Sequence, residues 1–152
     1  MPCGISLAHA AAARPTPLSR LSQSAVPLAT RLLGTVEAGF PSPAEEELCD
    51  TLSLDDYLVS NREATYLLGV KGDSMLDAGI LEGDMVLVER TSEAKAGDIV
   101  IAEVDREWTM KYLRKGPDGY YLQAANPKYP IIVPSGGLNI AAVVTSVIRK
   151  IR

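Results

Sequence analysis

The chain has 152 residues, of which 47% are hydrophobic and 22% are charged, a composition typical of one modest globular domain with an appendage. Its charge is unevenly distributed: residues 1–38 carry +2 and residues 39–152 carry −6, which together give the net charge of −4. An acidic body argues against a surface that follows nucleic-acid phosphates, so we expect no direct, sequence-specific DNA binding.

The first 36 residues are predicted to form a flexible arm, because their small residues and prolines bury too little apolar area to offset the entropy of ordering. Arginines and prolines interrupt this arm, which therefore lacks the continuous apolar stretch of a secretory signal, and we expect no membrane span. A cytoplasmic protein is the expectation. A transit-type leader is the alternative, since residues 5–34 are rich in Ala, Ser and Arg and contain no acid.

Local signals predict three short helices before the main body of the chain. They are Leu28–Leu33, ended by Gly34; one turn over Ala44–Leu48; and Ser53–Leu58, which has a helix start signal and apolar positions at i, i+3 and i+4. Between the first two, the segment Val36–Pro43 is predicted to be extended, because Pro41 and Pro43 disfavour helical geometry in the residues before them. Extended backbone is the form that a protease cleft accepts.

From Ala64 onward the pattern changes to β-strands separated by glycine-containing turns, which predicts a compact, mostly antiparallel β fold. The candidate strands are Thr65–Lys71, Met85–Glu89, Asp98–Asp105, Glu107–Arg114, Tyr120–Ala124 and Leu138–Ile151. Asp105 and Arg106 are expected to form a tight hairpin turn, although neither is the glycine preferred there.

Lys111 lies in the strand Glu107–Arg114, where side chains alternate between the two faces. Alternation places Trp108, Met110 and Tyr112 on one face and Thr109, Lys111 and Leu113 on the other. We therefore expect Lys111 to be partly buried, which disfavours the ammonium form and lowers a pKa that starts near about 10.4. A neutral amine can accept the hydroxyl proton of a nearby serine.

Ser74 is the candidate nucleophile, since the turn Gly72-Asp73-Ser74-Met75 can expose its hydroxyl. The backbone N–H groups of Ser74 and Asp73 are candidate oxyanion donors, and Thr109 is a candidate for orienting the Lys111 amine. The one histidine, His9, lies in the arm, so the body lacks the imidazole that a Ser-His-Asp triad requires.

No metal site or cofactor is expected. Cys3 and Cys49 are too few for a four-ligand zinc site, and Cys49 has no nearby histidine to serve as the base of a catalytic thiol. Each candidate also has an ordinary explanation, because serine after Gly-Asp is commonly a turn residue and a strand lysine is commonly a solvated charge. Composition and periodicity alone indicate a soluble, β-rich domain.

Several motifs occur at characteristic distances along the body. They are Gly72-Asp73-Ser74-Met75, Gly79-Ile80, Glu82-Gly83-Asp84, Gly97-Asp98-Ile99-Val100-Ile101-Ala102 and Trp108-Thr109-Met110-Lys111-Tyr112-Leu113, with Ala38-Gly39-Phe40-Pro41-Ser42-Pro43 upstream. In this combination, from about Val36 to Arg152, the chain resembles the LexA and UmuD family of self-cleaving SOS-response serine peptidases. The upstream segment looks like the cleavage segment of the UmuD branch, although the arm before it is longer than is typical there.

This resemblance implies an arm, residues 1–38, that self-cleavage removes from a β-fold peptidase domain, residues 39–152. It implies that Ser74 is the nucleophile, that Lys111 is the general base and that Ala38–Gly39 is the scissile bond. It further implies a homodimer whose cleavage is stimulated by RecA filaments on single-stranded DNA. In the UmuD branch, the cleaved dimer is a subunit of an error-prone Y-family polymerase with a UmuC-like catalytic chain.

Two alternatives of other classes stay open. One is an interaction module that keeps the fold without processing itself and binds a polymerase or repressor partner through an exposed strand edge or the arm. The other is a signal-peptidase-like enzyme that acts on other proteins. Cleavage within one subunit or between dimer mates is also open, because the 35 positions from Gly39 to Ser74 can span a small domain.

Overall fold

The structure is a computed structural model that describes residues 29–31, 51–91 and 93–152. The chain divides into two units, residues 1–57 and 58–152, each of which is described by itself. The predicted extended segment Val36–Pro43, the predicted turn of helix Ala44–Leu48 and the Ala38–Gly39 boundary lie outside the described residues.

In the first unit, strand β1 (Ala29–Arg31) pairs antiparallel with strand β2 (Thr51–Ser53). The predicted helix over Leu28–Leu33 is therefore wrong in its central part. An isolated short helix must first form a costly nucleus, whereas pairing with β2 gives the backbone of β1 its hydrogen-bond partners directly. The helix predicted from Ser53 is confirmed as α2 (Leu54–Leu58), and Ser53 Oγ accepts a hydrogen bond from Asp56 N at 3.4 Å. No helix in the described part of the chain is long and apolar enough to cross a membrane.

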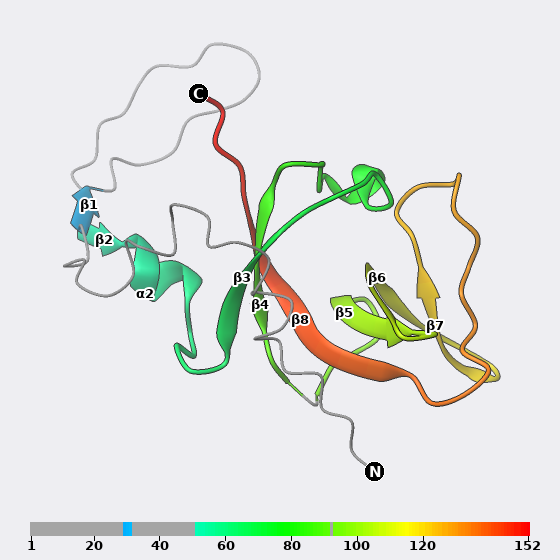
Figure 1. The fold of residues 1–152 in the computed structure, drawn as a ribbon. Coiled ribbons are helices and arrows are strands. Elements are labelled where there is room, and N and C mark those ends of the chain that lie inside the picture. The colour runs from blue at the N-terminus through cyan, green and yellow to red at the C-terminus, as the bar shows by residue number, and fades with distance from the viewer. Residues whose placement is uncertain (1–28, 32–50, 92) are drawn as a thin grey trace. The chain divides into compact units, whose positions relative to one another are not determined.

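The second unit is built on one antiparallel sheet of six strands, in the order β3-β4-β8-β5-β6-β7. The strands are β3 (Thr65–Gly69), β4 (Met85–Glu89), β5 (Ile99–Val104), β6 (Glu107–Gly116), β7 (Gly119–Gln123) and β8 (Asn139–Ile148). Figure 1 shows β8 as a long, curved strand between β4 and β5. Its register shifts against both neighbours, as expected where bulges bend a strand. The predicted mostly antiparallel β fold is confirmed.

The core lies on both faces of this sheet, in two clusters of buried residues. The first contains Met75, Ile80, Val86, Val88, Ile101, Ala125 and Ala142, and the second contains Val100, Ala102, Leu113 and Leu122. Trp108, Met110 and Tyr112 pack against the first cluster, whereas Leu113 belongs to the second. The predicted alternation of β6 is therefore confirmed, and it assigns Lys111 to the face of Leu113.

The turn between β5 and β6 is the two-residue hairpin predicted at Asp105 and Arg106. Val104 pairs with Glu107 across it, and the φ angles of Asp105 and Arg106 are 50° and 68°. Positive φ at both central positions gives a turn whose twist matches that of the strands, which explains why this hairpin forms without glycine. The hairpin fixes the register that places Lys111 opposite Val100.

Candidate active site

The side chains of Ser74 and Lys111 meet in the second unit, although they are 37 residues apart in the chain. Ser74 lies in the turn between β3 and the short 3-10 helix η2 (Leu76–Ala78), and Lys111 lies in the middle of β6. Lys111 Nζ is 2.9 Å from Ser74 Oγ, which is within hydrogen-bonding distance. The structure therefore brings together the two residues that the sequence singles out.

Lys111 is buried, with 6% of its surface exposed. Val100 lies opposite it on β5, and Leu113 follows it on the same face of β6. Burial among such neighbours disfavours the ammonium form and lowers the pKa of Lys111 below its usual 10.5. The shift has the direction that a general base operating near neutral pH requires.

The other contacts of Lys111 orient its amine toward Ser74. Nζ donates to Thr109 Oγ1 at 2.7 Å and to the carbonyl oxygen of Met110 at 3.0 Å. A neutral amine has two N–H donors and one lone pair, so these two acceptors take both N–H groups. The lone pair then faces the third neighbour, Ser74 Oγ, and can accept its proton. Thr109, the candidate for orienting the amine, is thus in direct contact with it.

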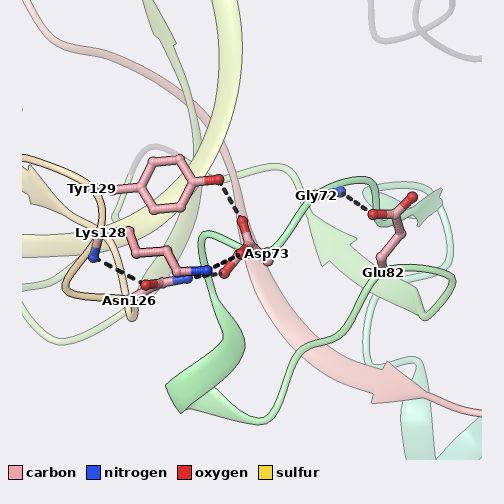
Figure 2. A network of polar contacts seen from close by, with 6 residues as sticks. All are labelled: Gly72, Asp73, Glu82, Asn126, Lys128 and Tyr129. Atoms are coloured by element: carbon pink, nitrogen blue, oxygen red, sulfur yellow. Dashed lines mark hydrogen bonds and ion pairs between the residues drawn. The ribbon is translucent and has the colours of Figure 1, made fainter.

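The loop after β7 holds the turn that carries Ser74 (Figure 2). Asn126 Nδ2 donates to the carbonyl oxygen of Asp73 at 2.8 Å, and Tyr129 OH donates to Asp73 Oδ1 at 2.5 Å. Lys128 Nζ lies 3.5 Å from Asp73 Oδ2. The hydrogen bond from Tyr129 is the main reason that the pKa of the Asp73 carboxyl is lowered, and the same bond raises the pKa of Tyr129.

Asn126 and Tyr129 were missed by the sequence reasoning. Asn126 is buried, with 6% of its surface exposed, and Nδ2 and Oδ1 are both hydrogen-bonded, Oδ1 accepting from Lys128 N at 3.1 Å. The one available signal was an Asn-Pro pair, which is typical of any turn.

A second set of contacts, made by Arg149 near the C-terminus, holds residues that follow the Ser74 turn. Arg149 donates to both carboxylate oxygens of Asp84 at 2.6 Å and to the carbonyl oxygen of Gly79 at 2.7 Å. Asp84 is buried, and its pair with Arg149 lowers its pKa to about 2. Just before Ser74 in the chain, the N–H of Gly72 donates to Glu82 Oε2 at 3.3 Å (Figure 2). In the segment from Gly72 to Asp84, one contact therefore joins Gly72 to Glu82, and Arg149 holds Gly79 and Asp84.

The candidate oxyanion donors are the backbone N–H groups of Asp73 and Ser74. Among residues 51–91 and 93–152, the Ser74 N–H donates no hydrogen bond, whereas the backbone of Asp73 contributes a hydrogen bond to its own carboxyl. The side chain of Asp73, in contrast, is engaged with the loop after β7. Any role of Asp73 in binding an oxyanion therefore falls to its backbone.

An apolar groove lies beside Thr109. It has a volume of about 240 Å³ and includes side chains of Leu68, Val86, Ile101, Trp108 and Met110 in its lining. Thr109, which contacts the Lys111 amine, also lines it. Thr109 is therefore the residue that this groove shares with the surroundings of the dyad. As for metals, no group of three or more His, Cys, Asp or Glu side chains in the described residues could hold an ion.

Comparison with known proteins decides the family. Residues 31–145 match the model of the Peptidase S24-like family, which is more than half of the chain. The chain belongs to this family of self-cleaving serine peptidases. The predicted LexA and UmuD type of fold is thereby confirmed.

The relatives differ in how much of their own length the match covers. A LexA repressor of Delftia acidovorans is 40% identical over 136 residues, which cover 88% of this chain and 58% of the repressor. LexA repressor 1 of Xanthomonas campestris is 49% identical over 107 residues, which cover 70% of this chain and 53% of the repressor. Protein SamA of Salmonella typhimurium is 40% identical over 130 residues, 86% of this chain and 89% of SamA. The chain thus spans just over half the length of these repressors and most of SamA.

Proposed function

We propose that this S24 peptidase cleaves its own chain between Ala38 and Gly39, with Ser74 as the nucleophile and Lys111 as the general base. The observation that carries this proposal is the 2.9 Å contact between Ser74 Oγ and the buried Lys111 Nζ. Membership of a self-cleaving family supports the choice of the protein's own chain as the substrate. The product would be residues 39–152.

In this mechanism the neutral Lys111 amine takes the Ser74 proton as Oγ attacks the carbonyl carbon of Ala38. The backbone N–H groups of Asp73 and Ser74 stabilise the resulting oxyanion. The Lys111 ammonium then gives its proton to the departing nitrogen of Gly39, which leaves Ala38 as an ester on Ser74. Lys111 next takes a proton from water, the hydroxide hydrolyses the ester, and the proton returns to Ser74.

The groove beside Thr109 is the proposed binding site for the segment that contains the scissile bond. Its apolar lining suits the apolar residues around that bond, among them Val36 and Phe40. The prolines at positions 41 and 43 favour the extended backbone that such a groove accepts. A small residue, Ala38, suits a position beside a buried lysine.

For the biological role, we propose an SOS-response protein that acts as a homodimer, is stimulated by RecA filaments on single-stranded DNA and becomes, once cleaved, a subunit of a UmuC-like Y-family polymerase. The match over 89% of SamA supports an arm-plus-peptidase architecture for this role. The second candidate is a regulator related to LexA repressors, favoured by identities of 40% to 49% to those proteins. The interaction module without self-processing is the third.

The test of the chemistry is incubation of the purified chain at alkaline pH, followed by intact-mass analysis. We expect a fragment that begins at Gly39, and we expect Ser74→Ala and Lys111→Ala to abolish it. Ser60→Ala and Lys115→Ala are matched controls, because both side chains are exposed, and Lys115 lies on the same strand as Lys111. The absence of this fragment from the unmodified chain, or its formation by both site variants, would overturn the assignment.

The test of the role is partner binding before and after cleavage. If cleavage switches the partner, residues 39–152 should bind the Y-family polymerase of the same genome more tightly than the Ser74→Ala chain does. Equal binding by both forms would favour the non-processing module. Binding to a repressor on its promoter DNA, and not to the polymerase, would favour the regulator related to LexA.

A further inference from the structure

Asp73 poses an electrostatic problem for a lysine base. It precedes Ser74, whose hydroxyl lies 2.9 Å from Lys111 Nζ. A carboxylate within about 4–6 Å of a lysine favours the ammonium form, which is inactive as a base. A dyad with this neighbour therefore works better if the carboxylate is bonded to other groups.

The loop after β7 supplies other partners for this carboxylate. Tyr129 OH donates to Asp73 Oδ1, and Lys128 Nζ lies 3.5 Å from Oδ2 (Figure 2). The Lys128 side chain is 76% exposed, so its ion pair is weak, whereas the Tyr129 hydrogen bond is the largest single influence on the Asp73 carboxyl. Burial alone lowers the pKa of Lys111, with no contribution from an acid in the described part of the chain.

We propose that Tyr129 is a positioning residue of the dyad: its hydroxyl holds the Asp73 carboxylate away from Lys111, so that the lysine can give up its proton and act as a base. This inference rests on the proposed function and assigns to its site a residue that does not take part in the bond-breaking steps. Asn126 supports the same geometry by holding the Asp73 carbonyl oxygen, which keeps the backbone of the turn in place while Tyr129 holds its side chain.

The surroundings of Lys111 make Tyr129 OH the group to test. The Tyr129 ring centre lies 5.8 Å from Lys111 Nζ, and an aromatic face at that distance favours the ammonium form slightly. The ring and the hydroxyl of Tyr129 therefore act on Lys111 in opposite senses. The opposing β5 residue, Val100, is apolar, and Lys71 reaches only the neighbouring groove. The titratable group that contacts Lys111 is thus Tyr129, and Tyr129 links it to Asp73 and, through Asp73, to Lys128.

Tyr129→Phe is the decisive variant, because it keeps the ring and removes the hydroxyl. We expect the midpoint of the pH profile of cleavage to move upward by about half a unit to one unit, with the alkaline plateau changed less than about twofold. Tyr120→Phe is a matched control: Tyr120 is 46% exposed against 40% for Tyr129, and its ring lies 5.8 Å from Lys115 Nζ. Its profile should coincide with that of the unmodified chain.

The double variant Tyr129→Phe with Asp73→Asn identifies the group that acts. If the freed carboxylate causes the shift, removal of its charge should return the midpoint to its original value. An unchanged midpoint in Tyr129→Phe would show that the hydroxyl is merely structural. A shift that persists in the double variant would show that Asp73 is not responsible, and either result overturns the proposal.

A titration that does not depend on cleavage separates this inference from the proposed function. In the full chain carrying Ser74→Ala and ¹³C-labelled lysine, the Lys111 resonance, assigned by its loss in Lys111→Arg, should titrate at higher pH when Tyr129→Phe is added. If this shift occurs but the unmodified chain never cleaves, the proposed function fails and the positioning role stands. If cleavage occurs but the Lys111 resonance does not shift, the positioning role fails alone.

Discussion

Cleavage of the Ala38–Gly39 bond should accelerate with pH, because only the neutral form of Lys111 can accept the Ser74 proton. A lysine with an ordinary pKa of about 10.4 is neutral in about one molecule in 2,500 at pH 7. Each unit by which burial lowers that pKa raises the neutral fraction about tenfold. Since burial lowers the pKa of Lys111 below 10.5, the logarithm of the rate should rise with a slope of about 1 per pH unit and level off at a midpoint below that value.

The assay is the first-order rate of appearance of the fragment 39–152, measured by intact mass at closely spaced pH values between about 6 and 11. Circular dichroism at each pH restricts the fit to conditions in which the protein is folded. Lys111→Arg is the control, because a guanidinium does not lose its proton in this range and cannot act as the base. We expect that variant to give no cleavage at any pH.

Three results would refute this reasoning. The first is a cleavage rate that does not change with pH. The second is a midpoint at or above 10.5, which would mean that burial does not favour the neutral amine of Lys111. The third is a Lys111→Arg variant with the same profile as the unmodified chain, because the titrating group would then lie elsewhere.

Further predictions concern the groups around the dyad and the core. Thr109→Val should lower the plateau rate about three- to tenfold through loss of the 2.7 Å contact with the amine, and an unchanged plateau would argue against an orienting role. Leu113→Ala, at a position 1% exposed, should lower the free energy of unfolding in urea by about 2–5 kcal/mol, against less than about 0.5 kcal/mol for Val133→Ala at 72% exposure. The pair of Asp84 with Arg149 lowers the pKa of the Asp84 carboxyl from 3.8 to about 2. The stabilisation that this pair gives the folded protein should therefore be complete above pH 3.8 and lost as the pH falls through about 2. Asp84→Asn should therefore melt at a lower temperature at pH 7 and lose less of its stability over that acid interval, which thermal melts would show.

The strands and the face of Lys111 were predictable because they depend on local alternation. In β6, side chains two apart share a face whatever the rest of the chain does, so burial of Leu113 implied burial of Lys111. Strand ends were less accurate: β3 ends at Gly69 rather than Lys71, because Val70 N already bonds the carbonyl oxygen of Asp84 in the loop before β4.

The contacts that hold the dyad in place were not predictable from local pattern. Tyr129 and Asp73 are 56 residues apart, and Arg149 and Asp84 are 65 residues apart. Each of these aspartates lies beside a glycine, and turn formation accounted for both. That explanation is incomplete, because a turn residue with a free side chain and one with a distant partner have the same local sequence. Only the contacts from Tyr129, which follows β7, and Arg149, which follows β8, distinguish them.

The arrangement of the site also predicts how the proposed stimulation by a RecA filament would act. Ser74 and Lys111 are already in contact, Asn126 holds the turn that carries Ser74, and Arg149 holds Gly79 a few residues later. The observed rate should then be the plateau rate multiplied by the neutral fraction of Lys111 and by the fraction of chains with residues 36–43 docked. A filament that promotes docking would raise the rate by the same factor at every pH, so the two profiles would be parallel on a logarithmic scale. A filament that lowered the pKa of Lys111 would instead give profiles that converge at alkaline pH, and that convergence would show that the dyad is not fully arranged beforehand. Because the contacts around Ser74 leave little to rearrange, we expect parallel profiles.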